Sequence, residues 1–187
     1  MWLSNKIWKT RIARIRAATR LTRNDFYSQL LVNYYSLFIV IVAIIDIQSN
    51  ELNLSLLILI LSILILCTSL FISSRDFKRR ALALKNCYTS LDKLYYRAKC
   101  IESKNENNEK EIQEILDKYT ELLSFFENHS KIDYLDVKNK VKNEENEDKL
   151  FWHESFYLYG YRIIKFLLIL LLFIFPIIAC RLLLYIQ

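Results

Sequence analysis

LLVNYYSLFIVIVAIIDIQSNELNLSLLILILSILILCTSLFI, residues 30–72, contains two apolar segments joined by a short polar turn, Gln48–Asn53. The segments cover residues 30–47 and 54–72 and carry no charge before Asp46. At about 1.5 Å of rise per residue, each is long enough for most or all of a hydrocarbon core roughly 30 Å thick. In lipid, a single segment satisfies its backbone polar groups only as a helix. The stretch therefore predicts a transmembrane helical hairpin.

Composition favours an all-α membrane protein. Of 187 residues, 53% are hydrophobic and 25% are charged, so the apolar residues must be gathered into blocks. One glycine and one proline leave little material for tight turns, phosphate-binding loops or β-α-β units. We divide the chain into a basic amphipathic helix (1–29), a transmembrane hairpin (30–74), a cytosolic helical region (75–149) and an aromatic segment with a C-terminal hydrophobic helix (150–187).

The distribution of charge predicts the topology. Seven Lys or Arg and no acid lie in the first 23 residues, and five more basic residues follow the second apolar segment within residues 75–85. The turn between the segments carries only Glu51. By the positive-inside rule, the N-terminus and both ends of the hairpin are cytoplasmic. No cleavable signal peptide is expected, because the first 29 residues lack an apolar core of sufficient length.

The first 29 residues predict a helix with one apolar face, formed by Ile7, Trp8, Ile12 and Ile15. Three interpretations stay open: the helix lies on the inner leaflet and binds anionic lipid, packs on its own cytosolic domain, or contacts phosphates of RNA or DNA. The candidate basic patch for lipid or a partner comprises Lys9, Arg11, Arg16, Arg20, Arg23, Arg75, Lys78, Arg79 and Arg80.

Small polar side chains recur inside the predicted spans. Asn33 and Ser36 lie in the first, and Ser55, Ser62 and Ser69 recur every seven residues in the second. Such residues let transmembrane helices approach closely and form hydrogen bonds. They either hold the hairpin together or line a pore when several copies assemble. Because no ring of charge is present, such a pore should discriminate poorly among ions.

After the hairpin, the pattern predicts a long helix from about Asp76 to Glu102 that continues from the second span. Its apolar positions follow a heptad repeat, and the candidate oligomer seam comprises Phe77, Leu84, Tyr88, Leu91 and Tyr95. A polar break, 102–108, precedes a second helix from Ile112 to Phe126, which we expect to fold back antiparallel. Either this helix or another subunit fills the seam. Residues 128–148 are expected to be irregular, with one or two helical turns at 134–140.

The C-terminal part begins with a dense group of aromatic residues, 150–161, which resembles an interfacial aromatic belt. Residues 166–186 form a third apolar block that contains Pro176 and Arg181. The simplest interpretation is a third span with a proline kink and with Arg181 at the far interface. The alternative is a helix that packs on the hairpin or lies in the interface.

No pattern of catalytic residues is present. The chain has no Gly-rich phosphate loop, no G-x-S-x-G and no H-E-x-x-H, and its two histidines, His129 and His153, lack a metal-ligand spacing. His153 beside Glu154 is a weak candidate for a metal or acid-base pair. The cysteines at 67, 87, 100 and 180 have no C-x-x-C spacing, so we expect free thiols. We predict no enzyme activity, no cofactor and no small-molecule substrate.

Two stretches resemble the SLATT family of membrane effectors from bacterial conflict systems. They are WKTRIARIRAATRLTRNDFYSQLLVNYYS, residues 8–36, and SLFISSRDFKRRALALKNCYTSL, residues 69–91. The most specific parts are the junction Ser73–Phe77 and the motif Lys85–Tyr88. Within this family, the sequence most resembles the subgroup whose genes are found beside reverse transcriptases.

The resemblance implies a two-transmembrane effector of the bacterial inner membrane. Such a protein is held inactive until a sensor partner responds to phage, and then oligomerises to disrupt the membrane. An alternative is a membrane anchor or inhibitory scaffold that recruits a cytosolic partner, such as a reverse transcriptase with its RNA. A small transporter subunit is a third hypothesis, although broken helices and repeats are absent from the sequence.

Overall fold

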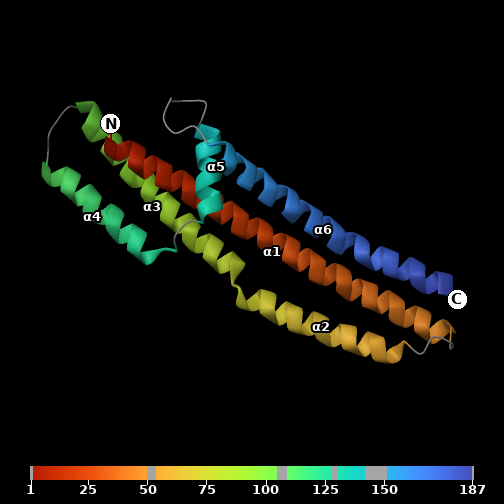
Figure 1. Ribbon diagram of the computed structural model, residues 1–187. Helices are drawn as coiled ribbons and strands as arrows, with labels where there is room; N and C mark the ends of the chain where they lie inside the picture. Colours follow the sequence, from red (N-terminus) through yellow and green to blue (C-terminus); the bar gives the residue numbers. More distant parts are fainter. Residues whose placement is uncertain (1, 50–53, 105–108, 128–129, 142–150, 187) are drawn as a thin grey trace. The chain divides into compact units, whose positions relative to one another are not determined.

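The computed structural model describes residues 2–49, 54–104, 109–127, 130–141 and 151–186 (Figure 1). Over these ranges the regular structure is entirely α-helical, which confirms the predicted fold class. The helices are α1 (Trp2–Ser49), α2 (Ser55–Ser74), α3 (Phe77–Lys104), α4 (Glu109–Phe125), α5 (Lys131–Val141) and α6 (Trp152–Ile186). Residues 50–53 of the predicted turn, residues 105–108 of the polar break, His129 and residues 142–150 lie outside the described residues.

Tertiary contacts divide the chain into two units. The head unit consists of Met1–Thr22 and Lys78–Tyr159, and the span unit consists of Arg23–Phe77 and Gly160–Gln187. The helices α1 and α6 contribute residues to both units. The predicted basic helix and first span are thus one continuous helix of 48 residues, without a break near residue 29.

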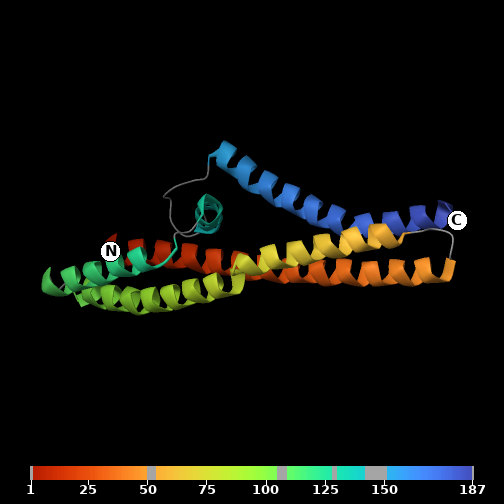
Figure 2. The same cartoon turned by 90° about the horizontal axis from the view of Figure 1, so that it is seen from below.

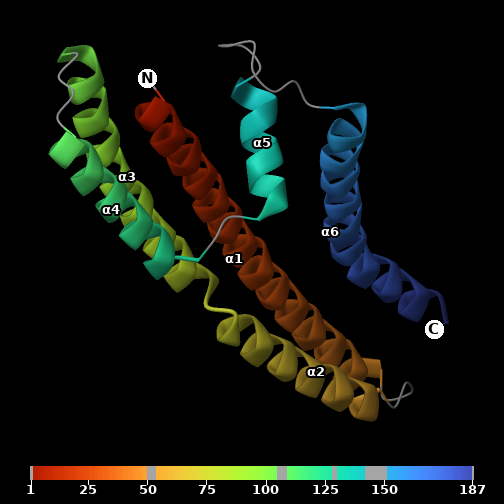
Figure 3. The ribbon, with the colours of Figure 1, turned by 60° about the vertical axis from the view of Figure 1, so that its left-hand side comes forward.

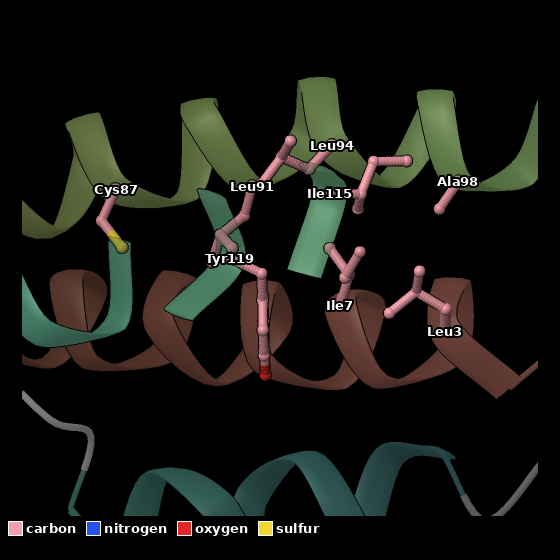
Figure 4. Close-up of a cluster of buried hydrophobic side chains, with 8 residues drawn as sticks. All are labelled: Leu3, Ile7, Cys87, Leu91, Leu94, Ala98, Ile115 and Tyr119. Carbon is pink, nitrogen blue, oxygen red and sulfur yellow. The ribbon is translucent and has the colours of Figure 1, made fainter. Parts of the chain in front are cut away.

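The core of the head unit is built by α1, α3 and α4, as Figure 4 shows. Its buried residues are Leu3 and Ile7 from α1, Cys87, Leu91, Leu94 and Ala98 from α3, and Ile115 and Tyr119 from α4. Each helix buries one apolar face because its apolar residues recur at helical spacing. The N-terminal basic helix therefore packs on its own domain, which was one of the three interpretations.

The same packing covers much of the predicted oligomer seam. Leu84 and Leu91 are 2% and 0% exposed within the single chain. Phe77, Tyr88 and Tyr95 are partly buried. The part of the seam around Leu91 is filled by α1 and α4 of the same chain, so no second subunit is needed there.

The helices α3 and α4 form the expected antiparallel pair (Figures 1 and 2). Arg80, near the start of α3, pairs with Glu127, just after α4. Near the other end, Arg97 Nη2 lies 3.3 Å from Glu114 Oε2. The order of these contacts is reversed along the two segments, which confirms the predicted fold-back.

The first turn of α1 is capped by a side chain from the far end of α3. Glu102 Oε1 accepts hydrogen bonds from the backbone N–H groups of Leu3 and Ser4, each at 3.1 Å, and Oε2 accepts one from Ser4 Oγ at 2.6 Å. A carboxylate is stabilising there because the first N–H groups of a helix have no intrahelical partner. Burial alone would raise the pKa of Glu102, but the hydrogen bonds from Ser4 outweigh it and hold that pKa below its usual range.

Helix α5 corrects the prediction for residues 128–148. It spans 11 residues instead of one or two turns, and it buries Leu135 and Val137. Ser130 N and Oγ donate hydrogen bonds to Asp133 Oδ2 at 3.0 and 2.7 Å, which is a capping arrangement at the helix start. The spacing Ser130-x-x-Asp133 was visible in the sequence, but the helix is short and weakly amphipathic.

The span unit contains the apolar parts of α1, α2 and α6. Three helices of the described chain are long and apolar enough to cross a membrane, and few residues in their apolar windows are buried. Asp46 Oδ1, at the end of the first span, accepts a hydrogen bond from Leu54 N at 2.9 Å and so links the two arms of the hairpin. The third block forms one helix through Pro176 and is one of the three that are long and apolar enough to cross a membrane.

The junction between α2 and α3 also corrects a prediction. The long helix does not continue from the second span, because Asp76 adopts a left-handed conformation with φ of 49°. Arg75 N and Asp76 N donate to the carbonyls of Ile72 and Ser73 at 3.1 and 3.2 Å. This arrangement ends α2. Aspartate is one of the few residues that adopt the left-handed region readily.

The cap on α1 gives a pH prediction. A lowered pKa in the folded state means that Glu102 stabilises the fold above its unfolded pKa, and that this stabilisation is lost as pH falls through the folded value. We expect Glu102→Gln to lower the free energy of unfolding by about 1 kcal/mol at neutral pH and to reduce its decline in acid. Thermal unfolding of the full-length protein in detergent at pH 7 and pH 4 measures this. An unchanged stability at pH 7 would contradict the capping role.

Candidate functional site

The small polar residues of the spans lie mostly at the surface of the single chain. Asn33, Ser36, Ser55 and Ser62 are exposed, and Ser69 is partly buried. The hydroxyls of Ser36 and Ser62 donate hydrogen bonds to the carbonyls of Val32 and Ile58 in their own helices, both at 2.8 Å. These two hydroxyls thus make their hydrogen bonds within one helix and not across the hairpin.

A different face of α2 borders an apolar groove in the span unit. The groove has a volume of about 540 Å³ and is enclosed by α1, α2 and α6. Its lining residues are Ser28, Leu31, Val32, Tyr35, Phe38, Ile39, Val42, Leu57, Leu61, Leu64, Ile65, Thr68, Ile72, Leu172, Phe175 and Ala179. Such a volume falls within the range of pockets that hold small molecules.

Two tyrosines of α1 bind carbonyls of α6 beside its proline. Tyr35 donates a hydrogen bond to the carbonyl of Leu172 at 2.9 Å, and Tyr34 donates one to that of Phe173 at 3.0 Å. Leu172 lies four residues before Pro176, so its carbonyl lacks the N–H donor that a helix normally supplies. The tyrosine hydroxyls therefore satisfy acceptors next to the kink, where a segment in lipid has no water to do so. Figure 3 shows the bend of α6.

In the head unit, four arginines of the predicted basic patch pair with acids of the same chain. Arg20 donates two hydrogen bonds to Asp133 at 2.9 and 3.0 Å, and Arg80 pairs with Glu127. Arg11 Nε lies 3.0 Å from Asp92 Oδ1, and Arg16 Nε lies 3.4 Å from Asp136 Oδ2. The other five members of the patch, Lys9, Arg23, Arg75, Lys78 and Arg79, are exposed.

The pair of Arg20 and Asp133 is the most buried of these contacts. Asp133 is 3% exposed, and its carboxylate also accepts the hydrogen bonds from Ser130. Burial would raise the pKa of Asp133, but the hydrogen bonds from Arg20 and Ser130 lower it below its usual range. The folded head unit therefore favours the charged form of this carboxylate.

Arg14 differs from these arginines because it is buried and, among the described residues, makes no close ion pair with an acid, although its charge lowers the pKa of Glu127. Its side chain is 1% exposed, and Nε and Nη1 have no hydrogen-bond partner among the described residues. Burial raises the pKa of the Cys87 thiol. The positive charge of Arg14 opposes this rise but is the weaker effect. Arg14 is not part of the predicted basic patch, and helical spacing alone does not indicate that its side chain is buried.

The chain matches the protein-family model of SMODS and SLOG-associating 2TM effector domain family 5 (SLATT family 5) over residues 2–182. The chain belongs to this family. SLATT domains are membrane effector domains of anti-phage conflict systems and are not a known enzyme family. The match includes residues of both the head unit and the span unit. Comparisons with curated proteins and with solved structures found no significant match.

In this SLATT chain, Glu154 and His153, the weak candidates for a metal or acid-base pair, make contacts that stabilise the fold. Glu154 accepts hydrogen bonds from Lys138 Nζ at 2.8 Å and from Phe151 N at 3.1 Å, so it caps α6. His153 stacks on Phe151 with ring centroids 5.6 Å apart. Among the described residues, no group of three His, Cys, Asp or Glu side chains is placed to hold a metal. Cys67, Cys87 and Cys100 are free thiols, and the side chain of Cys180 lies outside the described part.

The contrast between Arg14 and Arg20 gives a paired prediction. We expect Arg20→Met to lower the free energy of unfolding by about 2 kcal/mol or more, because it leaves the buried Asp133 without its cation. We expect Arg14→Met to leave the stability unchanged or to raise it, because no partner loses a hydrogen bond. Thermal unfolding of the full-length variants in detergent compares them. A loss for Arg14→Met as large as that for Arg20→Met would contradict the assignment.

The tyrosine contacts predict a dependence on the proline. We expect Tyr35→Phe to cost about 1 kcal/mol in the natural sequence, because the Leu172 carbonyl loses its donor. In a Pro176→Ala background the cost should vanish, because residue 176 then supplies an N–H group. Tyr27→Phe, in the same helix, is the control. A double-mutant cycle measured by unfolding in detergent tests the coupling, and equal costs in both backgrounds would rule it out.

Proposed function

We propose that this SLATT chain is a membrane effector that oligomerises through its spans when a sensor partner signals infection, forming a pore or disrupting the inner membrane and arresting or killing the cell. The observation that carries this proposal is the surface of the span unit. In the single chain, few residues in the apolar windows of the helices are buried.

The polar residues on that surface support assembly within the membrane. Asn33, Ser36, Ser55 and Ser62 are exposed on otherwise apolar helices. Without a hydrophobic driving force in lipid, helices associate through close packing of small residues and through hydrogen bonds. The serines at 55, 62 and 69 recur on one flank of α2. This flank is a surface of small polar residues on which a second copy of the chain could pack.

The buried head core favours the spans over the seam as the assembly surface. Leu84 and Leu91 already pack inside the head unit, so their exposure to another subunit would require the head unit to open. The partner that triggers assembly, for which a reverse transcriptase, RNA or a nucleotide sensor are candidates, is expected to act on the exposed surface of the head unit. The cytoplasmic N-terminus follows from the charge pattern.

The alternative of an anchor for a ribonucleoprotein has less support. An arginine that is already paired with a carboxylate is less available to phosphates. Arg11, Arg16, Arg20 and Arg80 are each close to an acid of the chain. Nucleic-acid binding through the remaining cations would depend strongly on salt.

Membrane permeability tests the proposal. In bacteria that express the chain with its neighbouring genes and are challenged with phage, the natural protein should collapse the membrane potential and admit propidium iodide. We expect Ser62→Leu to reduce dye entry about tenfold at equal protein level, because a bulky residue disturbs close helix packing.

The matched control is Cys67→Leu, which adds bulk at an exposed position on another face of α2. This variant should keep full permeability. A natural protein that protects cells while the membrane potential stays intact, and that co-purifies with a ribonucleoprotein, would instead support the anchor.

A further inference from the structure

The groove of the span unit has a polar end and an apolar interior. Its lining runs from Ser28 to Val42 along α1, which is about 21 Å at 1.5 Å per residue. Ser28, Tyr35 and Thr68 supply the hydroxyls of the lining, and the hydroxyl of Tyr35 is bonded to Leu172. Toward Val42 and Leu57 the lining is hydrocarbon only. This gradient matches a molecule with a polar head and a long apolar tail.

On each of the three segments that line the groove, a polar residue lies at helical spacing beyond the last lining residue at the Ser28 end. On α1, Asn24 lies one turn before Ser28, and on α2, Arg75 follows Ile72 by three residues. On α6, Lys165 lies two turns before Leu172. Lys165 Nζ donates a hydrogen bond to Asn24 Oδ1, which places these two residues together.

The charge at this end is positive. The parts of the span unit before Ser28, after Ile72 and before Phe166 contain the cations Arg23, Arg75, Arg162 and Lys165. The acids there are Asp25, which accepts a hydrogen bond from Gln29 at 3.1 Å, and Asp76. The four cations outnumber the two acids by two. An anionic group is therefore favoured at this end, which the charge pattern predicts to be cytoplasmic.

We propose that the groove between α1, α2 and α6 binds an anionic phospholipid, with one acyl chain in the groove and the phosphate held near Lys165 and Arg75. The groove is longer than the roughly 15 Å of hydrocarbon in one leaflet, so it accommodates a whole acyl chain. Arg75 lies over the ring of Phe71, with its guanidinium carbon 4.9 Å from the ring centroid, which holds it near the end of α2. The proposal does not depend on pore formation.

The first test is lipid binding by the full-length protein in detergent, followed by native mass spectrometry with added phosphatidylglycerol or phosphatidylcholine of the same acyl chains. Phosphatidylglycerol should bind with a stoichiometry of one and more tightly than phosphatidylcholine. Arg75→Gln and Lys165→Gln should each weaken phosphatidylglycerol about fivefold and phosphatidylcholine less, because both lipids carry a phosphate but only phosphatidylglycerol has a net negative charge. Lys78→Gln, an exposed cation outside the span unit, is the control. Equal binding of both lipids by all variants would overturn the proposal.

The second test asks where the acyl chain lies. Ile39→Trp fills the groove and should abolish tight binding of phosphatidylglycerol, whereas Ile41→Trp, on the exposed surface two residues away, should not. A phosphatidylglycerol with a photoreactive acyl chain should label peptides from residues 28–42 and 57–72 in the natural protein. This readout does not depend on the folding of a variant. Crosslinks from these peptides to a second copy in place of lipid, or labelling of other segments only, would refute the site.

Discussion

The bilayer requires every backbone polar group of a spanning segment to find its partner inside the protein, and the span unit is arranged around this requirement. Along most of the length of the three apolar stretches, the hydrogen bonds of the α-helix satisfy this requirement. Pro176 breaks the rule at one position, because it removes the donor for the Leu172 carbonyl. Tyr34 and Tyr35 supply hydroxyls to the carbonyls there. The hydrogen bonds that satisfy these carbonyls of α6 also link α6 to α1 beside the proline.

Charge is handled differently in the head unit. Arginines of α1 lie near acidic residues of α3 and α5, and an arginine of α3 lies near an acidic residue just after α4. Asp92, Glu127, Asp133 and Asp136 each lie near one arginine of α1 or α3. Water screens such pairs at the surface, and their net contribution is small there. Around the buried Asp133 the pairing is essential, because a lone buried carboxylate is far more costly than an exposed one.

Several elements were predictable because they depend on local properties of the sequence. The spans follow from length and lack of charge, and the pair of α3 and α4 follows from its heptad spacing. The break between α2 and α3 at Asp76 was missed because no glycine or proline marks it. Helix α5 was missed because 11 residues with few apolar positions give little periodicity. The roles of Glu102, Arg14 and Tyr35 depend on residues about 70 to 140 positions away, and periodicity contains no information about such contacts.

The helix α2 offers two surfaces that do not compete. Leu61, Thr68 and the other groove residues form one face, and Ser55, Ser62 and Ser69 lie about 100° around the helix from Leu61. A lipid in the groove would contact the first face and leave the serine flank open to a second copy. Without the lipid, the groove face of α2 would have no apolar partner beside α6. Without the second copy, the serine flank of α2 would face the acyl chains of the bilayer. The proposed lipid site and the proposed assembly surface therefore use different faces of one helix.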